Sequence, residues 1–298
     1  MAYLLLTLTT LFWAGNFVLG RAMNDVLPPV VMAEMRWGSA LLLILPFLLP
    51  KLKAHWRVIL KHWKLLLPLG ILSVGSFNTL IYVGLTMTEA TNATLMQSAI
   101  PILILLITGL FLKEVVTARQ WAGVACSLVG VLTLISLGDL SQLLNLDINK
   151  GDLWILAAVL CWSGYSILLR WRPAELDGFT FFGTTVVIGV IALLPFALFE
   201  LSSVPPFELK PEALGSVLYM AIFPSILAHL FWNRGVAELG AAKAGLFIHL
   251  MPLFGMLLST FFLGEKIHTY HLAGMILIFL GIYLAVVSNV MKRTPKQN

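Results

Sequence analysis

The chain has 298 residues, of which 59% are hydrophobic and 11% charged, and its mean hydropathy is +0.94. Soluble domains carry about 25% charged residues, so this composition excludes a water-soluble globule and predicts an integral membrane protein. The net charge of +5 does not indicate a nucleic-acid partner, because the basic residues lie between apolar segments. Cys126 and Cys161 lie in apolar runs without metal-ligand spacing, so we expect no disulfide, no metal site and no cofactor.

Ten apolar runs bounded by charge, glycine or proline are long enough to cross a bilayer as helices. They predict an all-α fold with short connections and no additional soluble domain. The first run has no basic stretch before it and no cleavage pattern after it, so we interpret it as a retained helix. In chain order the predicted spans are 3–21, 30–50, 65–86, 91–112, 120–137, 152–170, 179–200, 213–235, 243–263 and 270–290.

Most Lys and Arg residues lie in the connections after even-numbered spans and in the C-terminal tail. By the positive-inside rule, this asymmetry predicts that both termini are cytoplasmic. Segment 51–64 repeats apolar residues at helical spacing among five basic residues. It is typical either of a short helix on the cytoplasmic leaflet or of a basic loop with interfacial tryptophans, and we favour neither over the other.

The two halves of the chain repeat one another. At an offset of 149, Trp13-Ala14-Gly15 aligns with Trp162-Ser163-Gly164. At 151, the aligned pairs are Gly84 and Gly235, Ala93 and Ala244, Pro101 and Pro252, Leu112 and Leu263, Glu114 and Glu265, Gly123 and Gly274, and Gly130 and Gly281. We therefore predict one five-helix repeat in 1–139, a second in 151–290, and a cytoplasmic tail at 291–298.

Each repeat has five spans, an odd number, so the second enters the membrane upside down relative to the first. Inverted repeats are typical of secondary transporters, in which the two halves exchange roles to open a midplane site to either side. A purely structural duplication is the alternative, and we favour the transporter.

The sequence resembles the EamA-type branch of the drug/metabolite transporter superfamily. The resemblance rests on Trp13-Ala14-Gly15-Asn16, Pro28-Pro29 with Arg36, the stretch from Ala90 through Pro101 to Glu114, Gln120, Gly123 and Gly130, and then Pro252, Glu265, Gly274 and Gly281. It implies a ten-helix exporter of amino acids, other metabolites or drugs, with relatives that flip lipid-linked or nucleotide sugars. The second half lacks a charged counterpart of Arg36 near 184–186, which argues against a symmetric role for that arginine.

Proline and tryptophan residues in mid-span are the first candidates for the site. Pro101 and Pro252 interrupt helix hydrogen bonding, either around a midplane site or to bend helices for packing. Trp13 and Trp162 lie away from the interfaces that membrane tryptophans prefer, so they line a cavity or fill space between helices. Because these two residues form a repeat-related pair, we favour the cavity, to which Tyr82, Tyr165, Phe77 and Trp232 would add aromatic surface.

Polar side chains within the spans are few, and each is expected to face the bundle interior. Asn16, Asn78, Gln97 and Asn233 are candidate substrate contacts. The sequence positions of His229 and His249 place both at similar depth near the cytoplasmic ends of their spans. There the two histidines could face each other and couple export to protons. The more conservative interpretation, which we favour, is that both are neutral, hydrogen-bonded core residues.

Three charged residues are candidate gate or structural groups. Arg36 could bind a substrate carboxylate, but it could also snorkel to the headgroups or anchor its own repeat, and we favour a structural role. Glu114 and Glu265 end their spans at opposite faces of the membrane, so we interpret them as gate or turn residues.

Our leading hypothesis is a secondary exporter of small amphiphilic metabolites, with amino acids as the favoured example, in the inner membrane of a bacterium. The chain has no HExxH, no GxSxG and no pair of mid-span aspartates, so we do not expect an enzyme. A flippase or exchanger of lipid-linked or nucleotide-linked sugars is the stronger rival, and a passive facilitator is a third possibility. The expected partners are a small-molecule substrate and the lipid bilayer, with coupling to protons left open, and the chain is expected to act as a monomer or homodimer.

Overall fold

The computed structural model describes residues 1–23, 26–88, 90–139, 141, 149–205, 211–263 and 268–287. Within these ranges every regular element is a helix. Nine helical segments are long and apolar enough to cross a membrane, and the apolar stretch Ala2–Phe17 forms a shorter tenth. The predicted all-α fold with ten helical spans is therefore confirmed.

The first half has five spans. The first, second and fifth are α1 (Ala2–Met23), α2 (Pro29–Lys61) and α7 (Ala118–Ile135). The third span is α3 (Trp63–Gly70), η1 (Ile71–Phe77) and α4 (Asn78–Leu85), and the fourth is α5 (Ala90–Gln97) and α6 (Ile100–Leu110).

The second half begins with α8 (Lys150–Leu168), η3 (Leu169–Trp171) and α9 (Gly178–Ser203). Its next span is α10 (Pro211–Met220), η4 (Ala221–Leu227) and α11 (Ala228–Leu239). The last two spans are α12 (Ala241–Gly245), η5 (Leu246–His249) and α13 (Leu250–Leu263), then α14 (Thr269–Ile282) and η6 (Tyr283–Val287).

Irregular turns interrupt equivalent spans of the two halves. The π-helical segments η1 and η4 have the same length and lie 150 positions apart. The fourth and ninth spans also break, between α5 and α6 and across the 3₁₀ turn η5, close to Pro101 and Pro252. Such irregular turns leave carbonyl groups without a partner in their own helix. These freed groups lie inside the bundle, where other side chains reach them.

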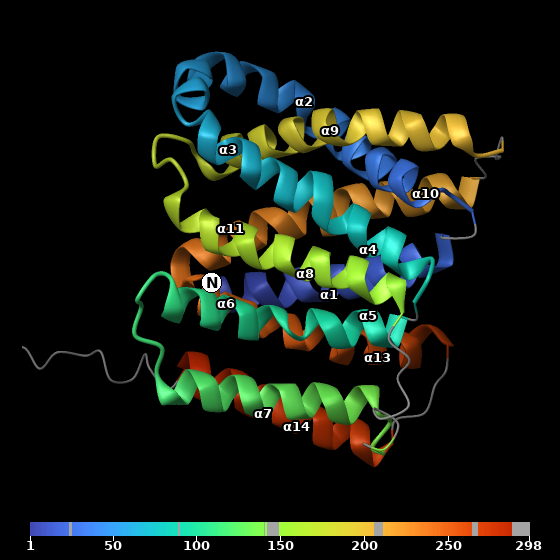
Figure 1. Cartoon of the computed structure of the whole chain (residues 1–298), viewed down its shortest axis with the longest axis vertical. Coiled ribbons are helices and arrows are strands. Elements are labelled where there is room, and N and C mark those ends of the chain that lie inside the picture. The colour runs from blue at the N-terminus through green and yellow to red at the C-terminus, as the bar shows by residue number, and fades with distance from the viewer. Residues whose placement is uncertain are drawn as a thin grey trace, which may run out of the picture.

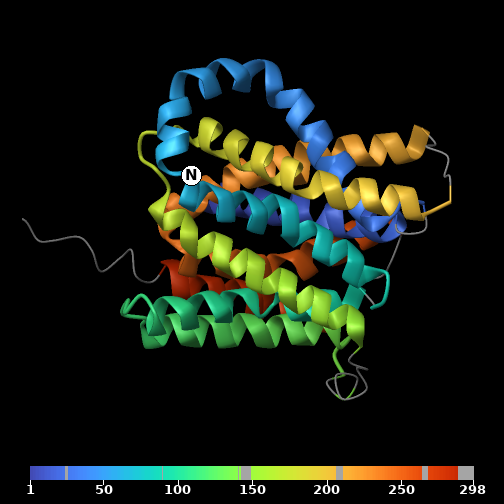
Figure 2. The same ribbon diagram turned by 45° about the horizontal axis from the view of Figure 1, so that its top comes forward.

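The helices pair about an approximate two-fold relation between the halves (Figures 1 and 2). Helix α7 packs against α14 at one edge and α2 packs against α9 near the other. Between these edges, α1 packs against α11 and α13, and α8 packs against the corresponding α4 and α6. Each half thus buries its first helix against the other half, and the centre of the molecule is built from both.

Segment 51–64 is helical as far as Lys61, but it continues α2 instead of forming a separate surface helix. Figure 2 shows α2 as an arc along the top edge of the molecule, and Pro46 and Pro50 lie within this helix. Asp177 connects this part of α2 to α9, because its carboxylate caps the first turn of α9 and pairs with Lys51 of α2 at 3.0 Å. Partial burial opposes ionisation of Asp177, yet hydrogen bonds from Thr180 and Lys51 outweigh it and hold its pKa well below the usual value.

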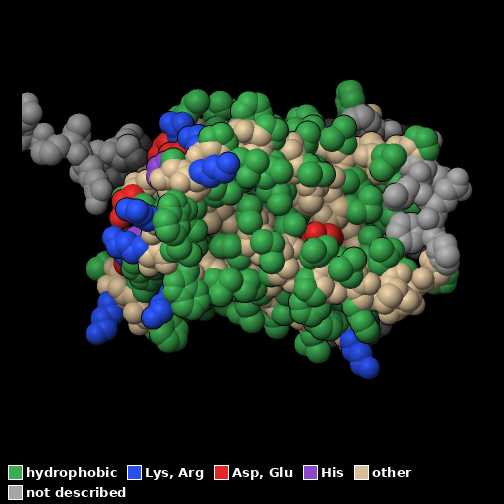
Figure 3. Space-filling model, turned by 90° about the horizontal axis from the view of Figure 1, so that it is seen from above, with side chains coloured by type: hydrophobic (Ala, Val, Ile, Leu, Met, Phe, Trp, Pro, Cys, Tyr) green, Lys and Arg blue, Asp and Glu red, His purple; other side chains and the backbone are tan. Residues whose placement is uncertain are grey.

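The outer surface divides by polarity along the helix axes. Figure 3 shows hydrophobic side chains over the middle of the molecule and most Lys, Arg, Asp and Glu side chains gathered at one end. Large apolar side chains such as Phe47, Phe111, Phe199 and Phe261 are mostly exposed. An apolar belt of this kind is stable in lipid and not in water, which fits a multi-pass membrane protein.

Candidate substrate site

Three tryptophans meet at the centre of the bundle, where α1, α8 and α11 pack together. The rings of Trp13 and Trp162 lie 4.9 Å apart, edge to face, and Trp232 lies 5.3 Å from Trp13 and 5.6 Å from Trp162. All three are buried. The structure thus brings the repeat-related pair Trp13 and Trp162 into direct contact, at a place that belongs to both halves.

Further rings extend this aromatic cluster. Phe77 lies 4.7 Å from the ring of Trp162, and Tyr165 lies 5.1 Å from it on the other side. The hydroxyl of Tyr165 donates a hydrogen bond to Oδ1 of Asn233 at 2.6 Å. The ring of His229 packs edge to face on Trp162 at 5.3 Å. The cluster offers a broad apolar and aromatic surface with polar groups at its margin, a surface that suits an amphiphilic solute.

Arg36 is completely buried beside this cluster, so it does not snorkel to the headgroups. Its Nη1 donates to Oδ1 of Asn78 at 2.7 Å, to the hydroxyl of Tyr82 at 2.9 Å and to Oδ1 of Asn16 at 3.2 Å. Its Nε donates to Oγ of Ser225, on η4 of the second half. Four predicted site residues, Asn16, Arg36, Asn78 and Tyr82, thus form one hydrogen-bonded group.

The irregular segment η4 supplies a backbone acceptor to the same region. The carbonyl of Pro224 accepts hydrogen bonds from Nε1 of Trp13 at 3.2 Å and from Nδ1 of His229 at 3.1 Å. Because a carbonyl can only accept, Nδ1 of His229 carries a proton, and Nε2 of the neutral ring is a free acceptor. Ser225 satisfies another carbonyl of the turn by donating to Met220 at 2.7 Å.

His249 has different neighbours. Its Nδ1 lies 2.6 Å from Oγ of Ser127 on α7, and its Nε2 lies 3.0 Å from the carbonyl of Ser98, at the break in the fourth span. Neither histidine is among the hydrogen-bond or ring contacts of the other in the described structure. The two histidines therefore do not face each other, and the bonds of His249 join three spans.

A small central cavity of about 20 Å³ lies between the halves, space for roughly one water molecule. Its wall includes five predicted site residues, Trp13, Asn16, Asn78, Gln97 and Trp162, and also Phe77, which we expected to add aromatic surface. It further includes five residues that sequence reasoning did not assign to the site, Phe17, Ile81, Ile100, Ile248 and Met251. These five side chains offered no signal, since an apolar residue in a cavity wall looks the same in sequence as one that faces lipid. Pro101 and Pro252 lie at the helix breaks and are not in the wall.

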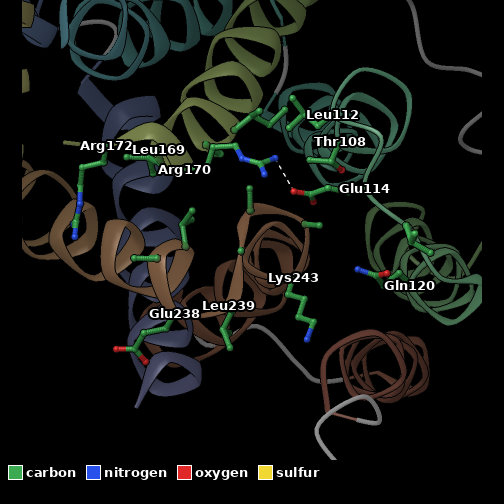
Figure 4. Close-up of a pocket in the computed structure, with 18 of the residues that line it drawn as sticks. Thr108, Leu112, Glu114, Gln120, Leu169, Arg170, Arg172, Glu238, Leu239 and Lys243 are labelled. Atoms are coloured by element: carbon green, nitrogen blue, oxygen red, sulfur yellow. Dashed lines mark ion pairs between the residues drawn. The ribbon is translucent and has the colours of Figure 1, made fainter. Parts of the chain in front are cut away.

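A much larger cavity, about 1010 Å³, opens at the basic end of the bundle, where α6, α8 and α11 end (Figure 4). Figure 4 shows Arg170 reaching from η3 toward Glu114, which follows α6, and their charged groups lie 2.6 Å apart. This ion pair joins the two halves at the rim. Arg172 and Lys243 add positive charge to the wall. Glu265, the repeat partner of Glu114, lies outside the described residues.

The opposite end of the bundle is closed where α4 meets α8. Oγ1 of Thr88 donates to Oδ1 of Asp152 at 2.6 Å, and both side chains are buried. A Cβ on Gly84 would lie 2.9 Å from the carbonyl oxygen of Gly151, so the two backbones touch. Among the described residues, the molecule therefore has a wide cavity at the basic end and a close contact between α4 and α8 at the other.

Ten apolar helices in two halves that enclose a shared central cavity have the architecture of a membrane transporter. The chain belongs to the EamA-like transporter family, whose model matches residues 1–136 and 149–287.

Relatives share this class along most of the chain. The chain is 31% identical to the "Uncharacterized transporter YyaM" of Bacillus subtilis over 99% of its own length and 96% of that protein. It is 26% identical to "Protein PecM" of Dickeya dadantii, over 87% of its own length and 82% of that protein. A solved crystal structure shares the fold with a TM-score of 0.75 at 18% identity, covering 96% of this chain and 98% of the other.

Proposed function

We propose that the protein is a secondary exporter that moves small amphiphilic metabolites out of the cytoplasm, with amino acids as the first class to test. The observation that carries the proposal is the central cavity, whose wall combines aromatic rings and amide groups from both halves. This cavity has space for roughly one water molecule in the present conformation, so the proposal requires it to widen when a solute enters and contacts both halves. Alternating access needs such a shared site.

The two ends of the molecule support a transport cycle. If the basic end faces the cytoplasm, as the positive-inside rule predicts, this conformation is inward-facing, with a wide entry cavity and with α4 and α8 in contact near the outer end. We propose that the outward-facing state exchanges these roles, so that α6 and α8 close while α4 and α8 separate. The site is complete within one chain, which favours a single chain as the transport unit in the bacterial inner membrane.

The test of this function is transport by purified protein in proteoliposomes. We expect proteoliposomes that contain the protein in the inside-out orientation to take up at least one labelled amino acid from a panel. The rate of uptake should exceed that of liposomes without protein. Proteoliposomes that move none of the panel but move a labelled lipid-linked or nucleotide-linked sugar would replace the exporter by the flippase or exchanger. Equal rates with and without an imposed pH gradient would identify a facilitator not coupled to protons.

If a pH gradient drives transport, we expect His229→Gln to abolish the stimulation and His249→Gln to retain it. Nε2 of His229 has no hydrogen-bond partner among the described residues, so it can gain a proton without breaking a bond, whereas both ring nitrogens of His249 are engaged. The measurement is the ratio of initial rates with and without the gradient. An unchanged ratio in His229→Gln would exclude this histidine from coupling.

A further inference from the structure

Arg36 is a buried cation without an anion. None of the ion pairs found in the described part of the chain includes it, and its hydrogen-bond acceptors, on Asn16, Asn78, Tyr82 and Ser225, are all neutral. Removing a charge from water without a counterion costs several kcal/mol, even where neutral groups solvate it. An arginine kept in this state at the centre of a bundle has unused capacity to bind an anion.

Unused hydrogen-bond donors surround the same place. Nη2 of Arg36, Nδ2 of Asn78 and Nε1 of Trp162 are all buried and have no partner among the described residues. The orientation of the Asn78 amide follows from Arg36, because a guanidinium can only donate and so holds Oδ1, leaving Nδ2 free. Arg36 and Asn78 are bonded to each other, and Asn78 and Trp162 line the same cavity, so buried donors without acceptors indicate a place for a group that is rich in acceptor oxygens.

These donors adjoin the central cavity. Asn78 and Trp162 are in its wall, and Arg36 stands directly behind Asn78 and Asn16, to which its Nη1 is bonded. The rest of the wall consists of Asn16, Gln97, the rings of Trp13 and Phe77, and apolar side chains. The cavity thus combines free hydrogen-bond donors with apolar surface, and a buried cation lies behind its wall.

We propose that Arg36 and Asn78 bind the carboxylate of the transported solute, which makes this a site for small organic acids, amino acids included, whose apolar part rests on the tryptophans. This inference rests on the proposed export function and names the group that the site selects. One oxygen of the carboxylate accepts from the free Nη2 of Arg36 and the other from Nδ2 of Asn78, and the carboxylate supplies the missing negative charge. The negative charge comes with the solute and not from the protein. The arginine is therefore without a counterion again when the solute leaves, and the site can bind another solute.

An internal carboxylate should compete with the solute. In Asn78→Asp, the new carboxylate occupies the position of an amide that lies 2.7 Å from Nη1 of Arg36, so it pairs with the guanidinium without a change of shape. We expect this variant to fold as stably as the wild type or better, and to lose its response to organic acids. A purely structural role for Arg36 predicts the same stability but an unchanged response, so this variant separates the two roles even if Arg36→Gln fails to fold.

The experiment measures thermal unfolding of purified protein in detergent with matched pairs of probes: leucine and leucinamide, phenylalanine and phenylalaninamide, and 3-phenylpropionate and 3-phenylpropanamide. We expect acids from this set to raise the unfolding temperature of the wild type and the amides to have little effect. Hydrogen bonds to charged groups contribute about 1.5–3 kcal/mol, so we expect roughly 10- to 100-fold weaker apparent affinity for the acids in Arg36→Gln and Asn78→Asp. Arg57→Gln, a change in the basic surface segment, is the matched control and should respond as the wild type does.

Three results would overturn the inference: no acid stabilises the wild type, the amides stabilise it as well as the acids do, or Asn78→Asp keeps the full response. Failure of the proposed function looks different. If acids bind in this assay but are not moved in proteoliposomes, the carboxylate site stands and the export function is wrong. If an amide is transported at the rate of its acid, the export function stands and the carboxylate site is wrong.

Discussion

Transport by the double variant Trp13→Leu/Trp162→Leu is expected to fall to background while folded protein is still recovered. The two rings meet edge to face at 4.9 Å and both line the central cavity, so their loss removes the aromatic surface from both halves at once. Removing a large aromatic side chain from a core costs about 3–5 kcal/mol when alanine replaces it, and leucine limits this loss by filling part of the space. The measurement is the initial transport rate per folded molecule, with folded protein quantified by size-exclusion chromatography.

The matched control is Trp121→Leu/Trp154→Leu, because these two tryptophans are 38% and 43% exposed and lie outside both cavities. We expect this control to transport at the wild-type rate. If the Trp13/Trp162 variant does so too, both rings serve packing alone and the proposed site is wrong.

Gly281→Val is expected to cause the largest loss of stability of any single substitution discussed for this protein. A Cβ on Gly281 would lie 2.5 Å from the carbonyl oxygen of Gly123 and 2.6 Å from the backbone nitrogen of Ser127, so α14 cannot keep its place against α7. Backbone atoms cannot move aside as a flexible side chain can. We expect a loss of at least about 2 kcal/mol, seen as a lower unfolding temperature and a lower yield of monodisperse protein.

Gly255→Val is the control for this prediction, since a Cβ there would meet no atom within 4 Å. It introduces the same β-branched residue into a membrane helix without a clash and is expected to behave almost as the wild type does. Equal unfolding temperatures for Gly281→Val and the wild type would show that α7 and α14 do not pack closely.

The helical spans were predictable because hydropathy and length decide where a chain can cross lipid. All ten predicted runs correspond to helical spans of the structure, and the longest departure is the continuation of α2 to Lys61. The π-helical segments were not predictable from apolar periodicity, since they depend on tertiary contacts. The bond from Arg36 of α2 to Ser225 of η4 is one such contact.

The burial of polar side chains in the spans was predictable, but their arrangement was not. The cost of polar groups in lipid predicted correctly that Asn16, Asn78 and His229 are buried. It could not predict which of them touch, because a residue's depth along a helix does not determine the direction in which its side chain points. The histidines illustrate this: similar depth suggested that they face each other, yet His249 reaches Ser127 on α7 and His229 packs among tryptophans.

Pairing between the halves has a consequence for synthesis. The partner of Nε of Arg36 is Ser225, made 189 residues later, and α1 packs against α11 and α13, which are made later still. At about 5–20 residues per second, translation leaves the first half in the membrane for roughly 10–40 seconds with this arginine lacking its final neighbours. During that interval the first half must therefore keep its arginine in the membrane without the full set of hydrogen-bond acceptors that the finished protein provides.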